Sequence, residues 1–535
     1  MTLSGHLGYR DGLLKQYRRY ALNFQGYTFY YHLSILQSRL SSHFAREKSL
    51  GTERFALPHE VAHLSSEKAH DYGLILGVDQ FGRTLQITPT KNRPNLGNVL
   101  KVAPSQGGKS TDFKKQLRHF KGSVIANDIK GELSRDTAHI RAQFSDVYYI
   151  NPLGNGNKFD PLFGKTSEDD LYDVANMLLD EPNEKDPAFT QRAIKMLTLL
   201  FLTARIAEVS PFVFVREVAK YGINALAKCI HEIHKELGNR LVDGDYNPKK
   251  DYRENKYLVD SWDSLTARLY PFLTETVVKS MSGSDFRIAD ILLSKRPVTI
   301  YLTWPESKLR ALKPIIKLIW GTIVSELMDL YDDEVEKNSL TFFQKILFLI
   351  DEGGVTPIPE LYDHIATCNG RGMSFEMGIQ ALSQLDAVYG KENAETILNN
   401  CAKVIFRQES FSTAKIVSDW SGGKSAFASS QTKHGEQTSE GKQEREIPLM
   451  TPQEIRGMPD DDILIWVRGV RYPIKAKRVP LLEKEVITPS LPPAPPLLLP
   501  APQPPPIVDT WRRASEAYPL LFAEREVGNE VSLGL

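Results

Sequence analysis

The sequence predicts an α/β protein with a mainly parallel central sheet, an inserted all-α domain and a disordered, proline-rich C-terminal tail. Short apolar runs bounded by turn residues alternate with helical patterns, which is typical of a parallel sheet covered by helices on both faces. Residues 167–293 interrupt these runs with helical patterns and no comparable strand signal. A chain of 535 residues is long enough for two or three domains with a large core.

The N-terminal region, residues 1–72, is expected to be helical, first over residues 1–50 and then over residues 57–70. Basic residues outnumber acidic ones in residues 1–50, which fits either a solvated helix face or a surface for nucleic acid or acidic lipid. Residues 20–38 carry no charged side chain but contain several polar ones. They therefore favour a soluble or interfacial amphipathic helix over a membrane span.

A glycine-rich loop follows the β-like alternation of residues 73–100 and precedes a helical pattern over residues 112–120. Backbone N–H groups at a helix start, together with one lysine, are what a phosphate-binding loop requires. We expect Lys109 to reach the β- and γ-phosphates of a nucleotide and Ser110 to offer its hydroxyl to Mg²⁺. The expected nucleotide-binding residues are Ala103, Pro104, Ser105, Gln106, Gly107, Gly108, Lys109, Ser110 and Thr111.

One position of this loop departs from the usual pattern, because Ala103 stands where the first glycine is expected. Alanine adds only a methyl group, so it is tolerable there if its φ stays negative.

Apolar, β-branched runs continue after the loop and predict the remaining strands. They lie at residues 123–128, 147–150, 297–303, 346–350, 373–379, 404–406 and 463–467. The helical insertion thus divides a nucleotide-binding domain into a first part, residues 73–166, and a second part, residues 294–480.

Two further segments have biased compositions. Residues 421–447 are rich in Ser, Gly, Gln, Lys and Glu and predict a mobile polar loop. Residues 481–535 predict a linker and tail, with polyproline II over residues 488–506 and a short terminal helix over residues 508–533 that docks on a partner.

An acid pair and a glutamine follow two of the expected strands. Asp351 and Glu352 come directly after an apolar run, at the strand end where open α/β sheets place their ligands. Asp351 is expected to hold Mg²⁺ or its water, and Glu352 to polarise the water that attacks the γ-phosphate. Gln380 ends another strand and is expected to sense the γ-phosphate. Two structural alternatives stay open: Asp351 caps the next element, or Gln380 is a buried side chain that bonds backbone.

Several short blocks, taken in chain order, resemble the coupling proteins of type IV secretion and bacterial conjugation, which are hexameric RecA-like motor ATPases. The resemblance covers roughly residues 51–480. Besides the loop and the acid pair, its blocks lie at residues 51–56, 127–133, 150–152, 159–162, 380–386, 413–414, 449–452 and 466–469. Each block is weak alone, but their shared order is specific.

The resemblance implies a RecA-like nucleotide-binding fold in which ATP hydrolysis, with Mg²⁺, drives DNA through a central channel. It assigns phosphate and Mg²⁺ binding to Lys109 and Ser110, metal and water to Asp351 and Glu352, and nucleotide sensing to Gln380. The implied partners are DNA, a relaxase or other secretion substrate, secretion-channel components and further copies in a homo-hexamer. The helical insertion is expected to engage substrate in the cytoplasm, with the inner membrane reached through partners.

Two departures from the family pattern stand out. The family usually begins with transmembrane helices, and the sequence contains no segment of adequate apolarity. The arginine that the family offers across the subunit interface falls at Asn369, and Arg371, two residues on, is the expected replacement. Lys130 either reaches nucleotide or a neighbouring subunit, or is a solvated lysine after a strand.

Two other functions compete with the DNA-moving ATPase. One is an adaptor that uses nucleotide as a switch and delivers protein cargo without pumping DNA, although such an adaptor has no need of Glu352. The other is a chromosome-partitioning or packaging motor with the same core. The equal numbers of basic and acidic residues, 66 each, do not discriminate among them. Three widely spaced cysteines indicate a reducing compartment and no zinc site.

Overall fold

The computed structural model of the chain describes residues 33–35 and 52–479, except residues 92–93, 155, 180–186, 271–272, 338–341, 356–357 and 435–436. The described chain forms two compact units. The first contains the described residues up to Gly122, Lys345–Val355 and those from Leu361 on, and the second consists mainly of Ser123–Gln344.

Several expectations lie outside the described residues. They are the helix over residues 1–50, apart from residues 33–35, which are helical, and the whole of the linker and tail from residue 481.

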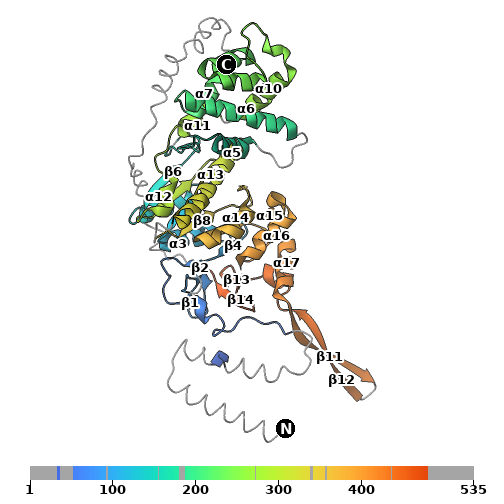
Figure 1. Ribbon diagram of the computed structural model, residues 1–535. Coiled ribbons are helices and arrows are strands. Elements are labelled where there is room, and N and C mark those ends of the chain that lie inside the picture. Colours follow the sequence, from blue (N-terminus) through green and yellow to red (C-terminus); the bar gives the residue numbers. More distant parts are fainter. Residues whose placement is uncertain are drawn as a thin grey trace. The chain divides into compact units, whose positions relative to one another are not determined.

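The first unit is built on a mixed sheet whose parallel part carries the phosphate-binding loop (Figure 1). β4 (Asn98–Val102) pairs in parallel with β10 (Cys401–Ile405) on one side and with β9 (Met373–Ile379) on the other. β9 in turn pairs in parallel with β8 (Ile346–Ile350). Every residue of β4, β8 and β9 is buried, as expected of strands covered on both faces. The predicted parallel α/β fold is confirmed here.

Antiparallel strands extend this sheet beyond β10. The sequence predicted a strand at residues 463–467 and β-like structure over residues 73–100, but not their antiparallel pairing. In spatial order they are β13 (Asp462–Trp466), β14 (Ile474–Lys477), β2 (Leu74–Val78), β3 (Thr84–Ile87) and β1 (Ser65–Ser66). β13 runs antiparallel to β10, and β14 returns antiparallel to β13.

The helices of the first unit connect these strands. They are α3 (Lys109–His119), α14 (Leu361–Thr367), α15 (Ser383–Tyr389), α16 (Lys391–Asn400), α17 (Phe411–Ser421) and α18 (Pro452–Arg456), with the 3₁₀ turns η1 (Ala62–Leu64) and η4 (Cys368–Arg371). α3 begins at Lys109, three residues before the helical pattern seen in the sequence, because the phosphate-binding loop opens directly into the helix.

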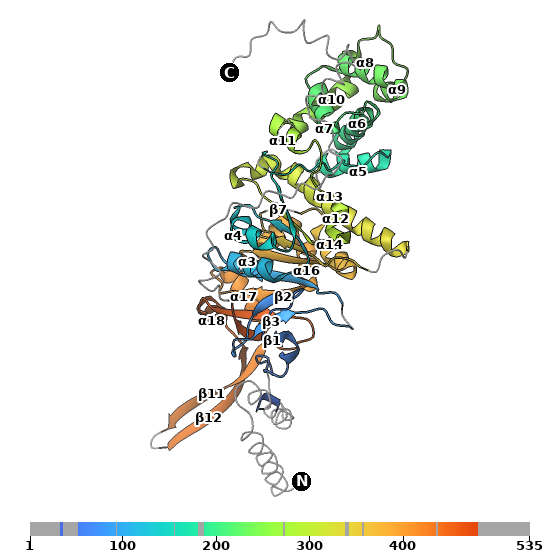
Figure 2. The same ribbon diagram turned by 90° about the vertical axis from the view of Figure 1, so that its left-hand side faces the viewer.

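The second unit combines a parallel sheet with the predicted helical insertion (Figure 2). Its strands pair in the order β5 (Ser123–Asn127), β7 (Val298–Leu302), β6 (Asp146–Ile150). α4 (Glu132–Arg141) joins β5 to β6, and α13 (Leu309–Glu336) follows β7. The described residues of the insertion form helices joined by loops, with no strand among them: α5 (Glu168–Leu179), α6 (Pro187–Ile206), α7 (Pro211–Val218), α8 (Ile223–Ile233), α9 (Lys235–Val242), the 3₁₀ turn η2 (Tyr252–Glu254), α10 (Lys256–Leu269), α11 (Glu275–Ser280) and α12 (Ile288–Leu293).

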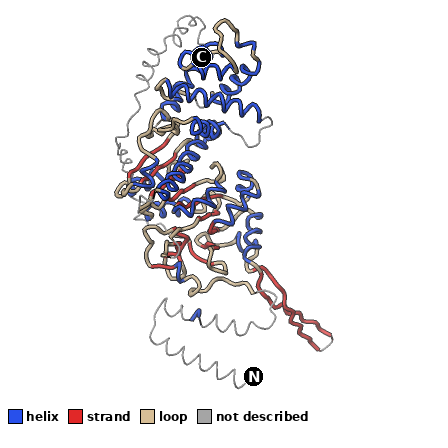
Figure 3. Tube along the Cα trace, viewed as in Figure 1, coloured by secondary structure: helices blue, strands red, loops and turns tan. Residues whose placement is uncertain are grey.

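The polar segment 421–447 is a hairpin, so the prediction of a loop was wrong. β11 (Gly423–His434) and β12 (Gln437–Pro448) pair antiparallel along their length and form a separate two-stranded sheet (Figure 3). A β-ladder is made by backbone N–H and C=O groups, so two strands can pair without the apolar alternation that a half-buried sheet requires.

The short helix expected over residues 57–70 is also absent from the described chain, where η1 and β1 occupy part of this stretch. The Glu60 carboxylate closes a turn instead, accepting hydrogen bonds from the backbone N–H of Leu57 at 2.7 Å and from Arg54 at 2.7 and 2.8 Å. Pro58 further disfavours helical backbone at the residue before it.

Among the described helices, none alone has the length and apolarity to cross a membrane. One pair, residues 190–206 and 211–218, meets both requirements jointly but is bent by 117°.

Candidate nucleotide-binding site

The glycine-rich loop that is predicted to bind phosphate lies between β4 and α3 of the first unit, where the sequence patterns placed it. The backbone N–H of Ala103 donates to Ile379 O at 3.0 Å, which anchors the loop's start to β9. Gln106 and Gly108 take the left-handed conformation, with φ of 62° and 95°. Ala103 is not among the described residues with positive φ, so the loop turns at later positions and an alanine at its start is tolerated.

Lys109 meets the two predicted acids at the carboxyl end of β8. Its Nζ lies 3.3 Å from Asp351 Oδ1 and 3.3 Å from Glu352 Oε2. The Lys109 side chain is 6% exposed and each acid 14%, so these charges interact where water screens them little. The structure therefore brings together two segments that are more than 240 residues apart in the sequence.

Ser110 and Asp351 bring a hydroxyl and a carboxylate oxygen close together in this cluster. Ser110 Oγ is 3.5 Å from Asp351 Oδ2, at the limit of a hydrogen bond. Hydroxyl and carboxylate oxygens suit Mg²⁺, which in nucleotide sites is bound by one or two carboxylates together with substrate phosphates. No group of three or more His, Cys, Asp or Glu in the described part of the chain could hold a metal ion. The oxygens present thus fit a Mg²⁺ that depends on phosphate for its other ligands.

Gln380, directly after β9, joins the same cluster. Its side-chain amide donates to Glu352 Oε2 at 3.0 Å, while its backbone N–H donates to Gln384 Oε1 at 2.8 Å. Glu352 has a φ of 59°, which is uncommon for a residue with a side chain. Gln380 and Lys109 contact the same Glu352 oxygen and hold the carboxylate in place.

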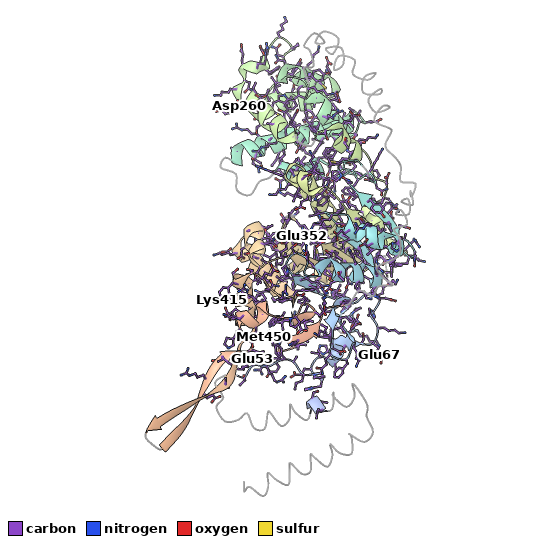
Figure 4. All side chains as sticks on the ribbon, turned by 180° about the vertical axis from the view of Figure 1, so that it is seen from behind. Glu53, Glu67, Asp260, Glu352, Lys415 and Met450 are labelled. Carbon is purple, nitrogen blue, oxygen red and sulfur yellow. The ribbon has the colours of Figure 1, made fainter. Side chains whose placement is uncertain are left out.

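Asp351 also accepts a hydrogen bond from the backbone N–H of Glu352, at 3.0 Å. The turn after β8 is closed further by Gly353 N–H, which donates to Gly378 O at 2.8 Å. The capping alternative is therefore compatible with the site, because one oxygen of Asp351 supports the turn and the other faces Ser110. Figure 4 marks Glu352 in the first unit.

The Lys109 side chain requires a glycine at position 378. A Cβ on Gly378 would overlap Cδ of Lys109 and approach the Phe113 ring to 2.8 Å. β9 thus presents a bare backbone to the Lys109 side chain, a requirement that sequence patterns did not reveal.

Two other predicted residues lie away from this cluster. Arg371 ends η4, before the start of β9, and its Nη1 donates to Thr367 O at 3.3 Å. Gln380 follows the other end of β9, so Arg371 and the nucleotide loop lie at opposite ends of the strand. Asn369, where the family arginine is expected, accepts a hydrogen bond from Gly97 N–H at 2.9 Å.

Lys130 lies in the second unit, exposed in the turn between β5 and α4. The preceding Asp128 is buried and caps α4, accepting hydrogen bonds from the backbone N–H groups of Leu133 and Ser134 at 3.1 and 2.7 Å. This part of the block at residues 127–133 thus has a structural role.

A fully buried ionic triad lies beneath the loop and was not predicted. Lys101 Nζ in β4 is 2.7 Å from Glu376 Oε1 in β9 and 3.4 Å from Asp112 Oδ2 in the first turn of α3. Burial raises the pKa of both carboxyls, and the two acids raise the pKa of Lys101 against its own desolvation. A charged residue inside an apolar run is the signal that could have found this triad.

Comparison with known proteins gives the family. Residues 73–493 match the family described as type IV secretory system conjugative DNA transfer. The chain belongs to this family. The resemblance to coupling proteins inferred from the ordered motifs is thereby confirmed.

Relatives and solved structures agree with this assignment. The protein VirD4 of Agrobacterium fabrum (strain C58) is 25% identical over 491 residues, covering 83% of this chain and 68% of VirD4. The conjugal transfer protein TraG of Escherichia coli is 24% identical over 446 residues, covering 73% of this chain and 68% of TraG.

The plasmid coupling protein TrwB, solved in complex with ADP and Mg²⁺, has a similar fold. Its TM-score is 0.56 at 18% identity, covering 79% of this chain and 93% of TrwB. A TrwB structure lacking its N-terminal 70 residues has a TM-score of 0.57 and covers 81% of this chain and 95% of that TrwB chain.

Proposed function

We propose that this member of the family is an ATP-hydrolysing motor that moves DNA and recruits a relaxase–DNA substrate to a type IV secretion or conjugative transfer system. The observation that carries the proposal is the meeting of Lys109, Asp351 and Glu352 within 3.3 Å at the phosphate-binding loop. TrwB, which shares the fold, has been solved with ADP and Mg²⁺, which supports ATP and Mg²⁺ as the cofactors.

Each residue of the cluster has a distinct proposed role. Backbone N–H groups at the start of α3 and Lys109 Nζ bind the phosphates, and Ser110 Oγ and Asp351 Oδ2 would hold Mg²⁺. At this position a Mg²⁺ ion would offset the negative charge of the phosphates. Glu352 orients the attacking water, and Gln380, bonded to Glu352, couples the state of the γ-phosphate to β9.

The functional assembly that we propose is a homo-hexamer on DNA. Arg371 is the candidate that reaches a neighbouring subunit's nucleotide, since it lies at the end of β9 away from its own loop. Relaxase or another secretion substrate and secretion-channel components are the further partners. The proposed location is the cytoplasm, with association to the inner membrane through partners.

The adaptor that delivers cargo without pumping DNA is less well supported. The family match is to conjugative DNA transfer, and Glu352 is held by Lys109 and Gln380 in the manner of a water-orienting carboxylate.

ATP hydrolysis by the full chain, measured with and without single- or double-stranded DNA, tests the proposal. We expect DNA to stimulate hydrolysis and Lys109→Ala to lower it by about 100-fold or more, because an electrostatic contact to the transferring phosphate is lost. Lys415→Ala, an exposed lysine on α17, is the matched control and should hydrolyse ATP like the unmodified chain. Equal hydrolysis by both variants would overturn the motor. Nucleotide binding without any hydrolysis would support the adaptor.

A further inference from the structure

A second cation lies at the phosphate-binding loop, on a residue to which the motifs assign no role. Gly108 immediately precedes Lys109, and a Cβ built on it would overlap Nη1 of Arg478 and lie 3.5 Å from its Cζ. The Arg478 guanidinium therefore rests on the backbone of the loop itself. Its side chain is 32% exposed, so it is accessible to a ligand.

The β13–β14 hairpin explains how Arg478 reaches the loop. β13 is antiparallel to β10, with Ile405 opposite Leu464 and Lys403 opposite Trp466, so the turn after β13 lies at the far edge of the sheet. β14 returns to the near edge, where Lys477 pairs with Asp462. Arg478 thus emerges at the edge where β4 and β10 end, which is the edge of the loop.

Asp461 holds the arginine in this position. Arg478 Nε donates to Asp461 Oδ1 at 2.9 Å, and Arg478 N–H donates to Asp461 O at 2.8 Å. A guanidinium has five N–H donors in a planar fork, so bonding through Nε orients the two Nη groups. Arg478 also opposes the rise in the pKa of Asp112 that burial causes, so its positive charge acts at the first turn of α3.

Strand order shows which part of a nucleotide this charge can reach. The strands lie in the sheet in the spatial order β14-β13-β10-β4-β9-β8. Arg478 therefore approaches β4 from one side, whereas Gln380 and the acid pair follow β9 and β8 on the other side. The acid-pair side serves the γ-phosphate in the proposed function. The opposite side is left for the part of the nucleotide that ATP and ADP share.

We propose that Arg478, positioned by Asp461, binds phosphate oxygens of the diphosphate portion of the nucleotide from within the same subunit. This inference rests on the proposed nucleotide site. A guanidinium fork matches phosphate oxygens with two parallel hydrogen bonds, which a lysine at this position cannot do.

The test is equilibrium binding of Mg·ADP and of a non-hydrolysable ATP analogue to the full chain. Arg478→Ala should weaken both ligands by a similar factor, about 10- to 100-fold, because a charge-assisted hydrogen bond to a shared group is lost. Arg478→Lys should recover only part of the affinity, and Asp461→Asn should weaken both ligands less than Arg478→Ala. At saturating ATP, the kcat of Arg478→Ala should stay within about twofold of the value of the unmodified chain, because the lost contact stabilises the ground state and the transition state equally.

Arg468→Ala is the matched control, because Arg468 is exposed in the turn at the other end of the same hairpin. It should bind both ligands like the unmodified chain. Unchanged affinity of Arg478→Ala for both ligands overturns the inference, as does weakened binding of the ATP analogue with ADP unaffected. If Arg478→Ala does not fold, Arg478→Lys and the ligand-induced shift in Tm carry the same comparison.

Failure of this inference differs from failure of the proposed function. If the unmodified chain binds nucleotide and Lys109→Ala does not, the site stands and only the role of Arg478 is in question. If Lys109→Ala and the unmodified chain bind equally, the nucleotide site itself is wrong.

Discussion

Glu352 shows how single residues make this site. Its backbone has a φ of 59°, and its carboxylate is contacted by Lys109 at 3.3 Å and by the Gln380 amide at 3.0 Å. A residue kept in a sparsely populated backbone region is typical of functional sites, where the surroundings hold it in place. The carboxylate thus has a defined position before any water or phosphate is considered.

Glu352→Gln should separate nucleotide binding from hydrolysis. The amide keeps the shape of the side chain but cannot accept a proton, so hydrolysis should fall by about 10²- to 10⁴-fold while affinity for Mg·ATP stays nearly unchanged. Steady-state hydrolysis and equilibrium binding measure the two effects. Glu395→Gln, an exposed glutamate on α16, is the control. Full hydrolysis by Glu352→Gln would rule out its role with water.

Gly378→Ala should disturb Lys109 from the strand beneath it. The added methyl overlaps Lys109 Cδ and crowds Phe113, so overpacking should cost about 1–3 kcal/mol of unfolding free energy. Nucleotide affinity should fall by about tenfold, since one favourable contact of about 1.4 kcal/mol is equivalent to that factor.

Chemical unfolding and nucleotide titration check this prediction. Gly222→Ala is a suitable comparison because a Cβ at Gly222 meets no atom within 4 Å. If Gly378→Ala bound nucleotide and unfolded like Gly222→Ala, the close approach of Lys109 to β9 would be incorrect.

At the scale of elements, the Lys101 triad connects the three elements that carry most of the proposed nucleotide site. β4 leads into the loop, α3 begins at Lys109, and β9 ends before Gln380, and each contributes one member of the triad. Burial raises the pKa of Asp112 and of Glu376 by more than the nearby Lys101 lowers it, and the charge of Asp112 raises that of Glu376 further.

Lys101→Met should destabilise the protein by about 3–5 kcal/mol at neutral pH, because two buried carboxyls lose their cation. A carboxyl whose pKa is raised by folding contributes stability below its unfolded pKa and loses that contribution as pH rises through the folded pKa. The destabilisation should therefore shrink toward acidic pH.

Chemical denaturation of Lys101→Met and the unmodified chain at several pH values measures this trend. Lys391→Met, an exposed lysine at the start of α16, should change stability little at any pH. A destabilisation that is independent of pH would indicate lost packing rather than buried charge.

At the scale of the whole molecule, the first unit alone supplies Lys109, Ser110, Asp351, Glu352 and Gln380. Arg371, by contrast, lies at the other end of β9 from Gln380, so a role in hydrolysis requires a second copy of the chain. The proposed hexamer therefore predicts that hydrolysis depends on an arginine from a neighbouring subunit, which a monomer cannot supply.

Mixing two inactive variants tests this requirement. Arg371→Ala lacks the arginine but keeps its own loop, and Lys109→Ala lacks the loop lysine but keeps Arg371. In a mixed assembly, some sites combine an intact loop with an intact arginine from a neighbouring subunit, so DNA-stimulated hydrolysis should partly return. The recovery should be easy to measure, because an arginine finger raises the rate of hydrolysis by about 10³- to 10⁵-fold. Adding Lys109→Ala to a chain that carries both substitutions should give no recovery. Full activity of Arg371→Ala alone would exclude it as the interface arginine.

Much of the site could be predicted because parallel strands finish at one edge of a sheet. The loop after β4, the acid pair after β8 and Gln380 after β9 each follow an apolar run directly, so local patterns sufficed to place them together. The hairpin at residues 423–448 could not be predicted in the same way, since backbone pairing leaves no periodicity in polar side chains.

The sequence by itself determined the α/β class, the helical insertion and the identity of the residues around the proposed phosphates, because strand runs and loop motifs are local in the chain. Only the tertiary structure decided that Lys101 is buried between two acids, that Gly378 makes room for Lys109, and that Arg478 reaches Gly108. These three depend on which strands become neighbours and in which direction they run. Neighbours in a sheet are chosen by the packing of the whole unit, and no short segment contains that information.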